Sequence, residues 1–298
     1  MLPTSVAPRH GAPPPLANGG IVCQGVSSGY FGKAVLHDVS FRIDEPAVYV
    51  VLGANGAGKT TLFRTLSGVL PAMGGEVSVG GAPVDHPSGR NQLHYLSHID
   101  GIPDGLKVRE ALEYYARVQR ATTADVDRVL DLLAIRDWSD HYLVQLSAGQ
   151  KKRVSVARVF LQPRSIYLLD EPTANLDPKV AREIRSLVLE LSRDKIVLYS
   201  SHNLYEAREI GRYVLAIKDG RIQLFDRIEN LRASRFVVGV RLTDPTVDLP
   251  GFRREGEYFV RELAGPEAVP DLLHELEARG ARVREVRELG NPLEDLFT

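Results

Sequence analysis

Hydrophobic and polar positions in the first part of the chain follow the two periods of strands and helices. Residues 21–23 and 39–43 alternate as half-buried strands do, and residues 47–52 form a continuous apolar run. A glycine-rich segment and a helix through Leu62 and Leu66 follow this run. A buried strand, a glycine-rich loop and a helix in this order are the usual setting of a phosphate site.

The pattern turns helical from about residue 123 to 162, where valines and leucines recur at helical spacing. It then alternates again, with a strand at 165–169, a helix near 178–193, a strand at 196–200 and a helix at 204–210. Such alternation is typical of a parallel sheet covered by helices. We therefore predict an α/β fold with an inserted helical subdomain at about residues 98–162, preceded by an antiparallel β subdomain.

The two ends of the chain differ in composition from this region. Residues 1–18 are rich in proline and contain little that could pack, so we predict a disordered tail. Beyond residue 226, strand-like runs at 235–242 and 257–262 precede a helical stretch at 266–279 and a strand at 281–289. We expect residues 19–226 to form the main domain, and residues 227–298 to form a small α+β domain of two strands, a helix and a strand.

Composition argues against several classes of protein. The formal net charge of -1 provides no global basic field for nucleic acid, so no nucleic-acid partner is expected. The single cysteine, Cys23, cannot form a disulfide within the chain. The longest apolar runs fall short of the roughly 20 residues that span a membrane, and the N-terminus lacks the layout of a signal peptide. If the protein works at a membrane, we expect it to dock on a membrane partner.

The glycine-rich segment matches the phosphate-loop pattern G-x-x-x-x-G-K-[ST]. Its glycines let successive backbone N–H groups point at a phosphate, and the following helix presents its positive end to the same anion. Lys59 is expected to neutralise β- and γ-phosphate oxygens, and the Thr60 hydroxyl to bind Mg²⁺. The predicted ATP-binding residues of this segment are Gly53, Ala54, Asn55, Gly56, Ala57, Gly58, Lys59, Thr60 and Thr61.

An acidic pair follows a later buried strand. Asp170 ends an apolar run, and Glu171 comes directly after it. A carboxylate at the end of a buried strand is costly unless it serves a cation, so Asp170 is predicted to bind Mg²⁺. Glu171 is placed to orient or deprotonate an attacking water. Such a pair elsewhere is often a helix cap or a loop charge, but the upstream phosphate loop favours the functional interpretation.

Further short motifs resemble those of the ABC ATPases. Residues 146–150, Leu-Ser-Ala-Gly-Gln, resemble the LSGGQ signature of that family. Tyr30 resembles the aromatic residue that stacks on adenine, residues 174–177 resemble the D-loop, and His202 resembles the switch histidine. The resemblance covers roughly residues 20–225 and implies a P-loop NTPase core. It also implies that Lys59, Glu171 and His202 are catalytic.

The signature motif implies a dimer, because in the family it completes the ATP site of the partner subunit. Ser147 is expected to cap a helix from Gln150 to Leu161 and, with the backbone N–H of Gly149, to bind a γ-phosphate. Ala148 replaces the commoner glycine but keeps the backbone donor. By the same resemblance, Gln150 and Asp177 belong to the nucleotide site.

The sequence departs from the family pattern at His98, where the family usually has a glutamine that ligates Mg²⁺ or the attacking water. An imidazole can accept a hydrogen bond from water, but it is a softer metal ligand than an amide oxygen. The haem-exporter ATPases of cytochrome c maturation look similar here and also carry LSAGQ, although they are shorter. We assign His98 to the nucleotide site, and a purely structural role stays open.

The resemblance implies an ATP-hydrolysing subunit of an ABC transporter, with ATP and Mg²⁺ as ligands. It would form a homodimer or pair with another ATPase subunit, dock on an integral membrane permease and lie at the cytoplasmic face of the membrane. Residues 291–297 resemble the ending of ATPases that serve drug and polysaccharide exporters, which favours export. A simple capping helix is also compatible with that ending.

Two other functions share part of this set of motifs. One is a soluble ABC ATPase that acts on nucleic acid or ribosomes, but such proteins carry long coiled coils or two fused ATPase halves, and neither is seen in this sequence. The other is a catalytically silent regulatory module, against which the intact Lys59, Asp170, Glu171 and His202 argue.

Overall fold

The computed structural model describes residues 19–98, 101–174, 176–232, 236–244, 249–263 and 268–289. The chain divides into two units, Met1–Asp226 and Arg227–Thr298, and each is described by itself. The proline-rich segment 1–18 and the ending 291–297 lie outside the described residues.

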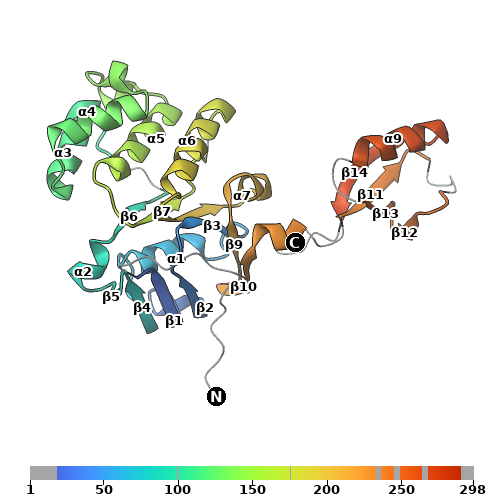
Figure 1. Ribbon diagram of the computed structural model, residues 1–298, viewed down its shortest axis with the longest axis horizontal. Coiled ribbons are helices and arrows are strands. Elements are labelled where there is room, and N and C mark those ends of the chain that lie inside the picture. The colour runs from blue at the N-terminus through green and yellow to red at the C-terminus, as the bar shows by residue number, and fades with distance from the viewer. Residues whose placement is uncertain are drawn as a thin grey trace. The chain divides into compact units, whose positions relative to one another are not determined.

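A six-stranded sheet forms the centre of the first unit, in the strand order β10-β9-β3-β8-β7-β6 (Figure 1). The strands are β3 (Ala47–Leu52), β6 (Leu93–Leu96), β7 (Ile166–Asp170), β8 (Ile196–Ser201), β9 (Tyr213–Lys218) and β10 (Arg221–Arg227). The five strands other than β10 pair in parallel. Because β3, β7 and β8 are buried along their whole length, they appear in the sequence as continuous apolar runs.

A second, antiparallel sheet has the strand order β2-β1-β4-β5. Its strands are β1 (Ile21–Tyr30), β2 (Lys33–Ile43), β4 (Gly74–Val79) and β5 (Ala82–Pro83), and the short helix α2 (Pro87–Arg90) follows. Helix α1 (Lys59–Leu66) places Leu62, Phe63 and Leu66 in one hydrophobic core with Phe41 of this sheet and Val51 of the central sheet. The first turn of α1 is thereby fixed at the end of β3.

The helical part of the first unit contains α3 (Val108–Gln119), α4 (Thr123–Leu132) and α5 (Ala148–Ala157). Figure 1 shows these helices gathered at the end of the unit opposite the antiparallel sheet. The helix predicted for Gln150–Leu161 is corrected: it begins at Ala148, because Ser147 caps it, and continues as a 3₁₀ turn, Arg158–Phe160. Two further helices, α6 (Pro178–Leu191) and α7 (Leu204–Ile210), complete the unit.

The second unit is an antiparallel sheet with one longer helix. It contains α8 (Ile228–Arg232), β11 (Phe236–Leu242), β12 (Arg253–Glu255), β13 (Tyr258–Leu263), α9 (Val269–Ala278) and β14 (Val283–Leu289). The strand order is β12-β13-β11-β14, and α9 packs on one face through Leu272 and Leu276, against Val238 and Val240. The predicted order of two strands, a helix and a strand missed β12, because its three exposed polar residues carry no hydrophobic alternation.

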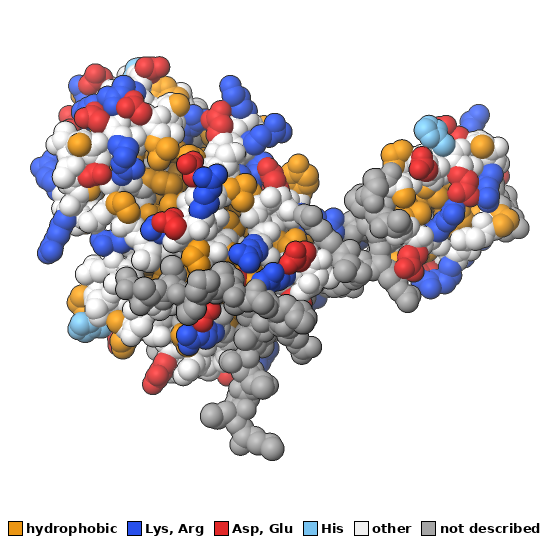
Figure 2. All heavy atoms as spheres, in the orientation of Figure 1, with side chains coloured by type: hydrophobic (Ala, Val, Ile, Leu, Met, Phe, Trp, Pro, Cys, Tyr) orange, Lys and Arg blue, Asp and Glu red, His pale blue; other side chains and the backbone are white. Residues whose placement is uncertain are grey.

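The surface mixes both signs of charge. Figure 2 shows Lys and Arg side chains interspersed with Asp and Glu side chains on the visible face of the first unit. Of the helices in the described residues, not one combines the length and the apolar character that a membrane crossing requires.

Candidate active site

The loop between β3 and α1 is shaped by its glycines. Gly58 has a φ of 110° and stands at the N-cap of α1, where a Cβ would lie 2.9 Å from Leu36 Cδ2. Gly56 has a φ of 84°. Residues with a side chain rarely adopt such angles, so the loop conformation requires glycine at both positions. The backbone N–H groups at the start of α1 are thereby left at the mouth of the loop.

Lys59 bends back over this loop. Its Nζ donates hydrogen bonds to the carbonyl oxygens of Gly53 (2.8 Å) and Ala54 (3.1 Å), and it lies 3.8 Å from Glu171 Oε1. The side chain is 6% exposed, and this burial lowers the pKa of Lys59, while the carboxylates of Glu171 and Asp170 oppose the shift. The loop thus holds a buried cation next to the acidic pair.

Asp170 is completely buried at the end of β7. Ser200, its neighbour on the parallel strand β8, donates a hydrogen bond from Oγ to Asp170 Oδ1 (2.7 Å). The other oxygen, Oδ2, has no hydrogen-bond partner within the described residues. A buried carboxylate oxygen left unpartnered is unfavourable, so Asp170 fits a cation ligand.

The metal that suits such a site is Mg²⁺. The described residues hold no cluster of three or more His, Cys, Asp or Glu side chains that could bind a metal. Mg²⁺ needs no such cluster, because it is commonly bound by one or two protein groups, with substrate phosphates and waters as the other ligands. Asp170 and Thr60, which lies on the first turn of α1 and lines the same pocket as Lys59, are the groups available here.

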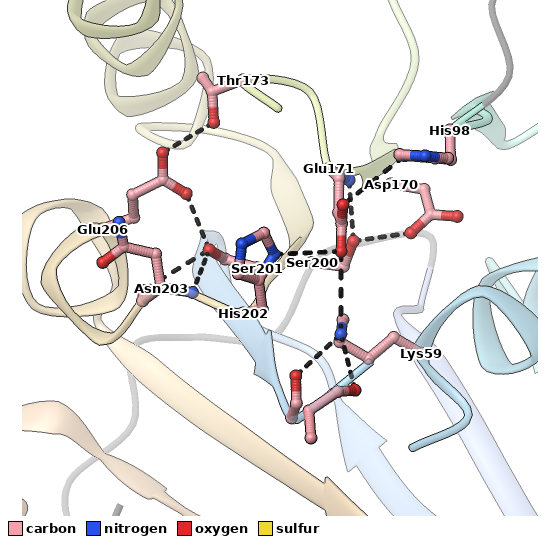
Figure 3. A network of polar contacts seen from close by, with 12 residues as sticks. Lys59, His98, Asp170, Glu171, Thr173, Ser200, Ser201, His202, Asn203 and Glu206 are labelled. Atoms are coloured by element: carbon pink, nitrogen blue, oxygen red, sulfur yellow. Dashed lines mark hydrogen bonds and ion pairs between the residues drawn. The ribbon is translucent and has the colours of Figure 1, made fainter. Parts of the chain in front are cut away.

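Glu171 is the centre of the polar contacts (Figure 3). Its carboxylate lies 3.4 Å from His202 Nδ1 and 3.6 Å from His98 Nδ1, in addition to its contact with Lys59. Its backbone has a φ of 47°, a left-handed conformation that is uncommon for a residue with a side chain. The Glu171 N–H donates to Ser200 Oγ (2.8 Å), which helps to fix this conformation. The structure thus brings together four of the residues predicted for the site.

Two adjoining pockets lie on either side of Glu171. The first, of about 500 Å³, is lined by the phosphate loop, His98, Glu171 and Val35. The second, of about 330 Å³, shares His98 and Glu171 and continues to Ser201 and His202. Val35 on β2 was missed by the sequence analysis, because an isolated valine in a strand carries no chemical signal.

Tyr30 has a different environment from the other predicted nucleotide contacts. It ends β1, and its hydroxyl accepts a hydrogen bond from Arg64 on α1 (3.1 Å). It is not among the described residues that line the pocket at the phosphate loop. Phe31, the next residue, is fully exposed.

The signature segment forms its own hydrogen-bonded turn at the start of α5. Ser147 Oγ accepts the N–H of Gln150 (3.3 Å), and Gln150 Oε1 accepts the N–H of Ser147 (2.8 Å), which together cap α5. Asp177 caps α6 in a similar way, through the N–H groups of Lys179 and Val180. The part of the first pocket that the structure describes includes none of residues 147–150 or Asp177.

Glu206 on α7 was also missed by the sequence analysis. Its carboxylate accepts hydrogen bonds from Thr173 and Ser201 (Figure 3). It also forms an ion pair with Arg185. Thr173 follows Glu171 by two residues, and Ser201 precedes His202. An acidic residue in the first turn of a helix is common, so the sequence gives it no special weight.

Comparisons with known proteins agree with this arrangement. Residues 36–174 match the family model described as ABC transporter. Nod factor export ATP-binding protein I of Rhizobium johnstonii is 32% identical over 207 residues, which are 66% of this chain and 66% of that protein. Cytochrome c biogenesis ATP-binding export protein CcmA of Xanthomonas campestris is 31% identical over 215 residues, which are 72% of this chain and 98% of that protein.

A solved structure of an ATP binding subunit of an ABC transporter covers 71% of this chain and 91% of its own, with a TM-score of 0.66 and 25% identity. The predicted fold class and the resemblance stated for residues 20–225 are confirmed by these matches. The chain therefore belongs to the ABC transporter family, as one of its ATP-binding subunits.

Proposed function

We propose that this chain is the motor subunit of an exporter, which hydrolyses Mg²⁺-bound ATP as a dimer and drives a separate membrane permease. Membership of the family makes the chain an ATP-binding ATPase. The proposal adds the metal, the role of each residue, the dimer, the permease and the direction of transport. It also treats residues 19–226 as the ATPase domain, within which residues 98–162 form the helical subdomain, and residues 227–298 as an accessory domain.

One observation carries the proposal: the buried Asp170 has an unpartnered oxygen next to Glu171, and Glu171 in turn contacts Lys59, His98 and His202. Thr60 and Asp170 would hold the metal, which neutralises phosphate charge when bound. Lys59 supplies a second positive charge at the phosphate oxygens. The glycines and the N–H groups of residues 53–61 would bind the phosphates.

Glu171 is proposed to act as the general base for the attacking water. Its carboxylate borders both pockets, so it can contact a water on either side. His202 directly follows β8 and His98 lies two residues beyond β6, and both imidazoles are about half exposed. The two histidines would hold the carboxylate and the water in position, and Tyr30 is proposed to stack on adenine.

The dimer is proposed because the signature residues lie outside the phosphate-loop pocket of their own chain. Ser147 caps α5, and Ala148, Gly149 and Gln150 begin the helix, where backbone N–H groups can bind an anion. Together with Asp177, which caps α6, they would close the ATP site of a second subunit. Export is supported by the names of two relatives, both of which are export ATP-binding proteins. A permease partner would place the chain at the cytoplasmic face of a membrane.

The experiment that tests this function is phosphate release from ATP, measured for the full chain with Mg²⁺ and with a chelator. Lys59→Ala and Asp170→Asn are each expected to lower turnover by about a hundredfold or more, because the first removes a positive charge at the phosphates and the second removes the charged ligand of the metal. Lys195→Ala, which removes a partly exposed lysine paired with Asp194, is the control and should keep turnover. Hydrolysis that is independent of Mg²⁺, or normal turnover of Lys59→Ala, would overturn the assignment.

A further inference from the structure

β14 forms one edge of the sheet in the second unit. In the described part of the chain it pairs with β11 on one side and with no strand on the other. The opposite edge, β12, is only three residues long, whereas β14 has seven, and Val286 at its middle is 38% exposed. A long edge strand presents N–H and C=O groups that can pair with another strand.

The sequence of β14, Val-Arg-Glu-Val-Arg-Glu-Leu, is complementary to itself when read in the opposite direction. In an antiparallel pair with two-fold symmetry, one residue stands opposite its own copy. With Val286 at that position, Glu285 of each copy lies opposite Arg287 of the other. An axis at Glu285 or at Arg287 would instead place like charges opposite each other, which destabilises a strand pair.

The charges on the neighbouring strands favour the same register. Arg241 on β11 stands opposite Glu285 in the sheet and forms ion pairs with both Glu285 and Glu257. Tyr258 donates a hydrogen bond to Glu285 Oε1 (3.1 Å). The Arg241 guanidinium therefore pairs with two carboxylates. Arg287 of a second copy, opposite Glu285, would supply a second positive charge.

We propose that β14 is an interface between two copies of this chain, paired antiparallel about Val286 so that two four-stranded sheets become one. The register shift next to Leu242 makes the pairing irregular at Arg284, so the regular part of the contact is short. A contact of this size is weak by itself. Its effect is to keep two subunits together, which raises the effective concentration at which their ATPase units meet.

The test uses the full chain without nucleotide and with a chelator, so that an ATP-dependent dimer does not contribute. Sedimentation velocity over a wide range of protein concentration should show reversible dimers. Val286→Lys places two ammonium groups opposite each other at the axis and should raise the dissociation constant at least about tenfold. Val286→Thr, which keeps the β-branched shape without charge, should leave it unchanged.

A second pair of variants distinguishes loss of the interface from loss of folding. Arg287 is exposed and lies opposite Gly239, so Arg287→Glu removes no packing on β11. This variant should also weaken the dimer at least about tenfold, whereas Arg287→Lys should not. The proposal is overturned if the nucleotide-free chain stays monomeric, or if it dimerises equally with Val286→Lys and Arg287→Glu. Neither outcome bears on the ATPase assignment, which rests on other residues.

Discussion

Thr173 and Glu206 are joined by a hydrogen bond of 2.8 Å from Thr173 Oγ1 to Glu206 Oε1. The second oxygen of the same carboxylate accepts a hydrogen bond from Ser201 Oγ (2.7 Å). One carboxylate therefore ties the segment that carries Glu171 to the segment that carries His202. Thr173 and Ser201 are both buried, so neither hydroxyl can exchange this partner freely for water.

We therefore expect Glu206 to affect the rate of ATP hydrolysis, although it forms no bond to Glu171 or His202. Glu206→Gln keeps the size of the side chain but loses its charge and one hydrogen-bond acceptor. We expect kcat for ATP hydrolysis to fall about tenfold, the equivalent of about 1.4 kcal/mol, with KM unchanged. Glu209→Gln is the matched control, because Glu209 pairs with the same Arg185 at 2.9 Å. Equal kcat values for the two variants would contradict a positioning role for Glu206.

Tyr30 offers a second prediction, because its hydroxyl and its ring can be tested separately. Tyr30→Phe removes the hydrogen bond from Arg64 and keeps the ring, so ATP affinity should be unchanged. Tyr30→Ala should weaken ATP binding by about 1–3 kcal/mol if the ring stacks on adenine. ATP titration of both variants and of Phe31→Ala distinguishes the two neighbouring rings. Loss of affinity in Phe31→Ala alone would transfer the stacking role to Phe31.

His98 is expected to couple the ATP site to transport. Lys152, buried on α5, donates a hydrogen bond to the backbone carbonyl of His98 (3.4 Å), a contact that substitution of the side chain leaves in place. His98→Gln should retain ATPase activity, since the amide can replace the imidazole near Glu171. His98→Ala should reduce transport in vesicles that contain the permease more than it reduces ATP binding. Full transport by the alanine variant would leave His98 a structural residue.

The dimeric mechanism predicts that Glu171→Gln traps ATP between two subunits. ATP should bind without being cleaved, and the dimer fraction in size-exclusion chromatography should rise on addition of Mg²⁺ and ATP. The difference between the dimer fractions with and without ATP excludes any association that does not need nucleotide.

Ser147 supplies the matched variants for this experiment, because its side chain caps α5. Added to Glu171→Gln, both Ser147→Asp and Ser147→Asn keep the cap. Only the aspartate variant brings a negative charge to the γ-phosphate, so only that variant should lose the ATP-dependent dimer. A dimer in both variants would show that the signature segment does not meet the phosphate.

His94 predicts a pH dependence of stability. Its Nε2 lies 2.6 Å from the carbonyl oxygen of Gln162, and burial lowers the pKa of His94 to about 4. In the unfolded chain His94 binds a proton near pH 6.5, whereas in the folded chain it stays neutral until about pH 4. Between these two values the unfolded state binds more protons than the folded state, so acidification favours unfolding. Stability should therefore fall over this window by up to about 1.4 kcal/mol per pH unit.

Urea unfolding across that pH range measures this effect. His94→Gln can still donate a hydrogen bond to Gln162 and does not titrate, so its stability should depend less steeply on pH than that of the unmodified chain. His141→Gln replaces an exposed histidine and should preserve the original slope. Equal slopes for all three proteins would contradict the assignment of this pH dependence to His94.

The amino-acid sequence by itself determined the fold class and the chemistry of the phosphate site. The conformation at Gly56 and Gly58 depends on the residues of the loop itself, so the motif can be recognised from these residues alone. The buried runs that end at Leu52, Asp170 and Ser200 predict parallel strands. Because parallel strands present their carboxyl ends at one edge, residues far apart in sequence meet there.

Tertiary structure alone decided which other side chains meet these residues. Glu206, Val35 and Ser200 reach the site through strand register and helix packing, and those relations join residues distant in sequence. Likewise, the sequence predicts β14 as a strand like any other, and only the strand order shows that it lies at the edge of its sheet. Local patterns encode backbone conformation and burial, whereas contacts across the fold depend on the simultaneous placement of several elements.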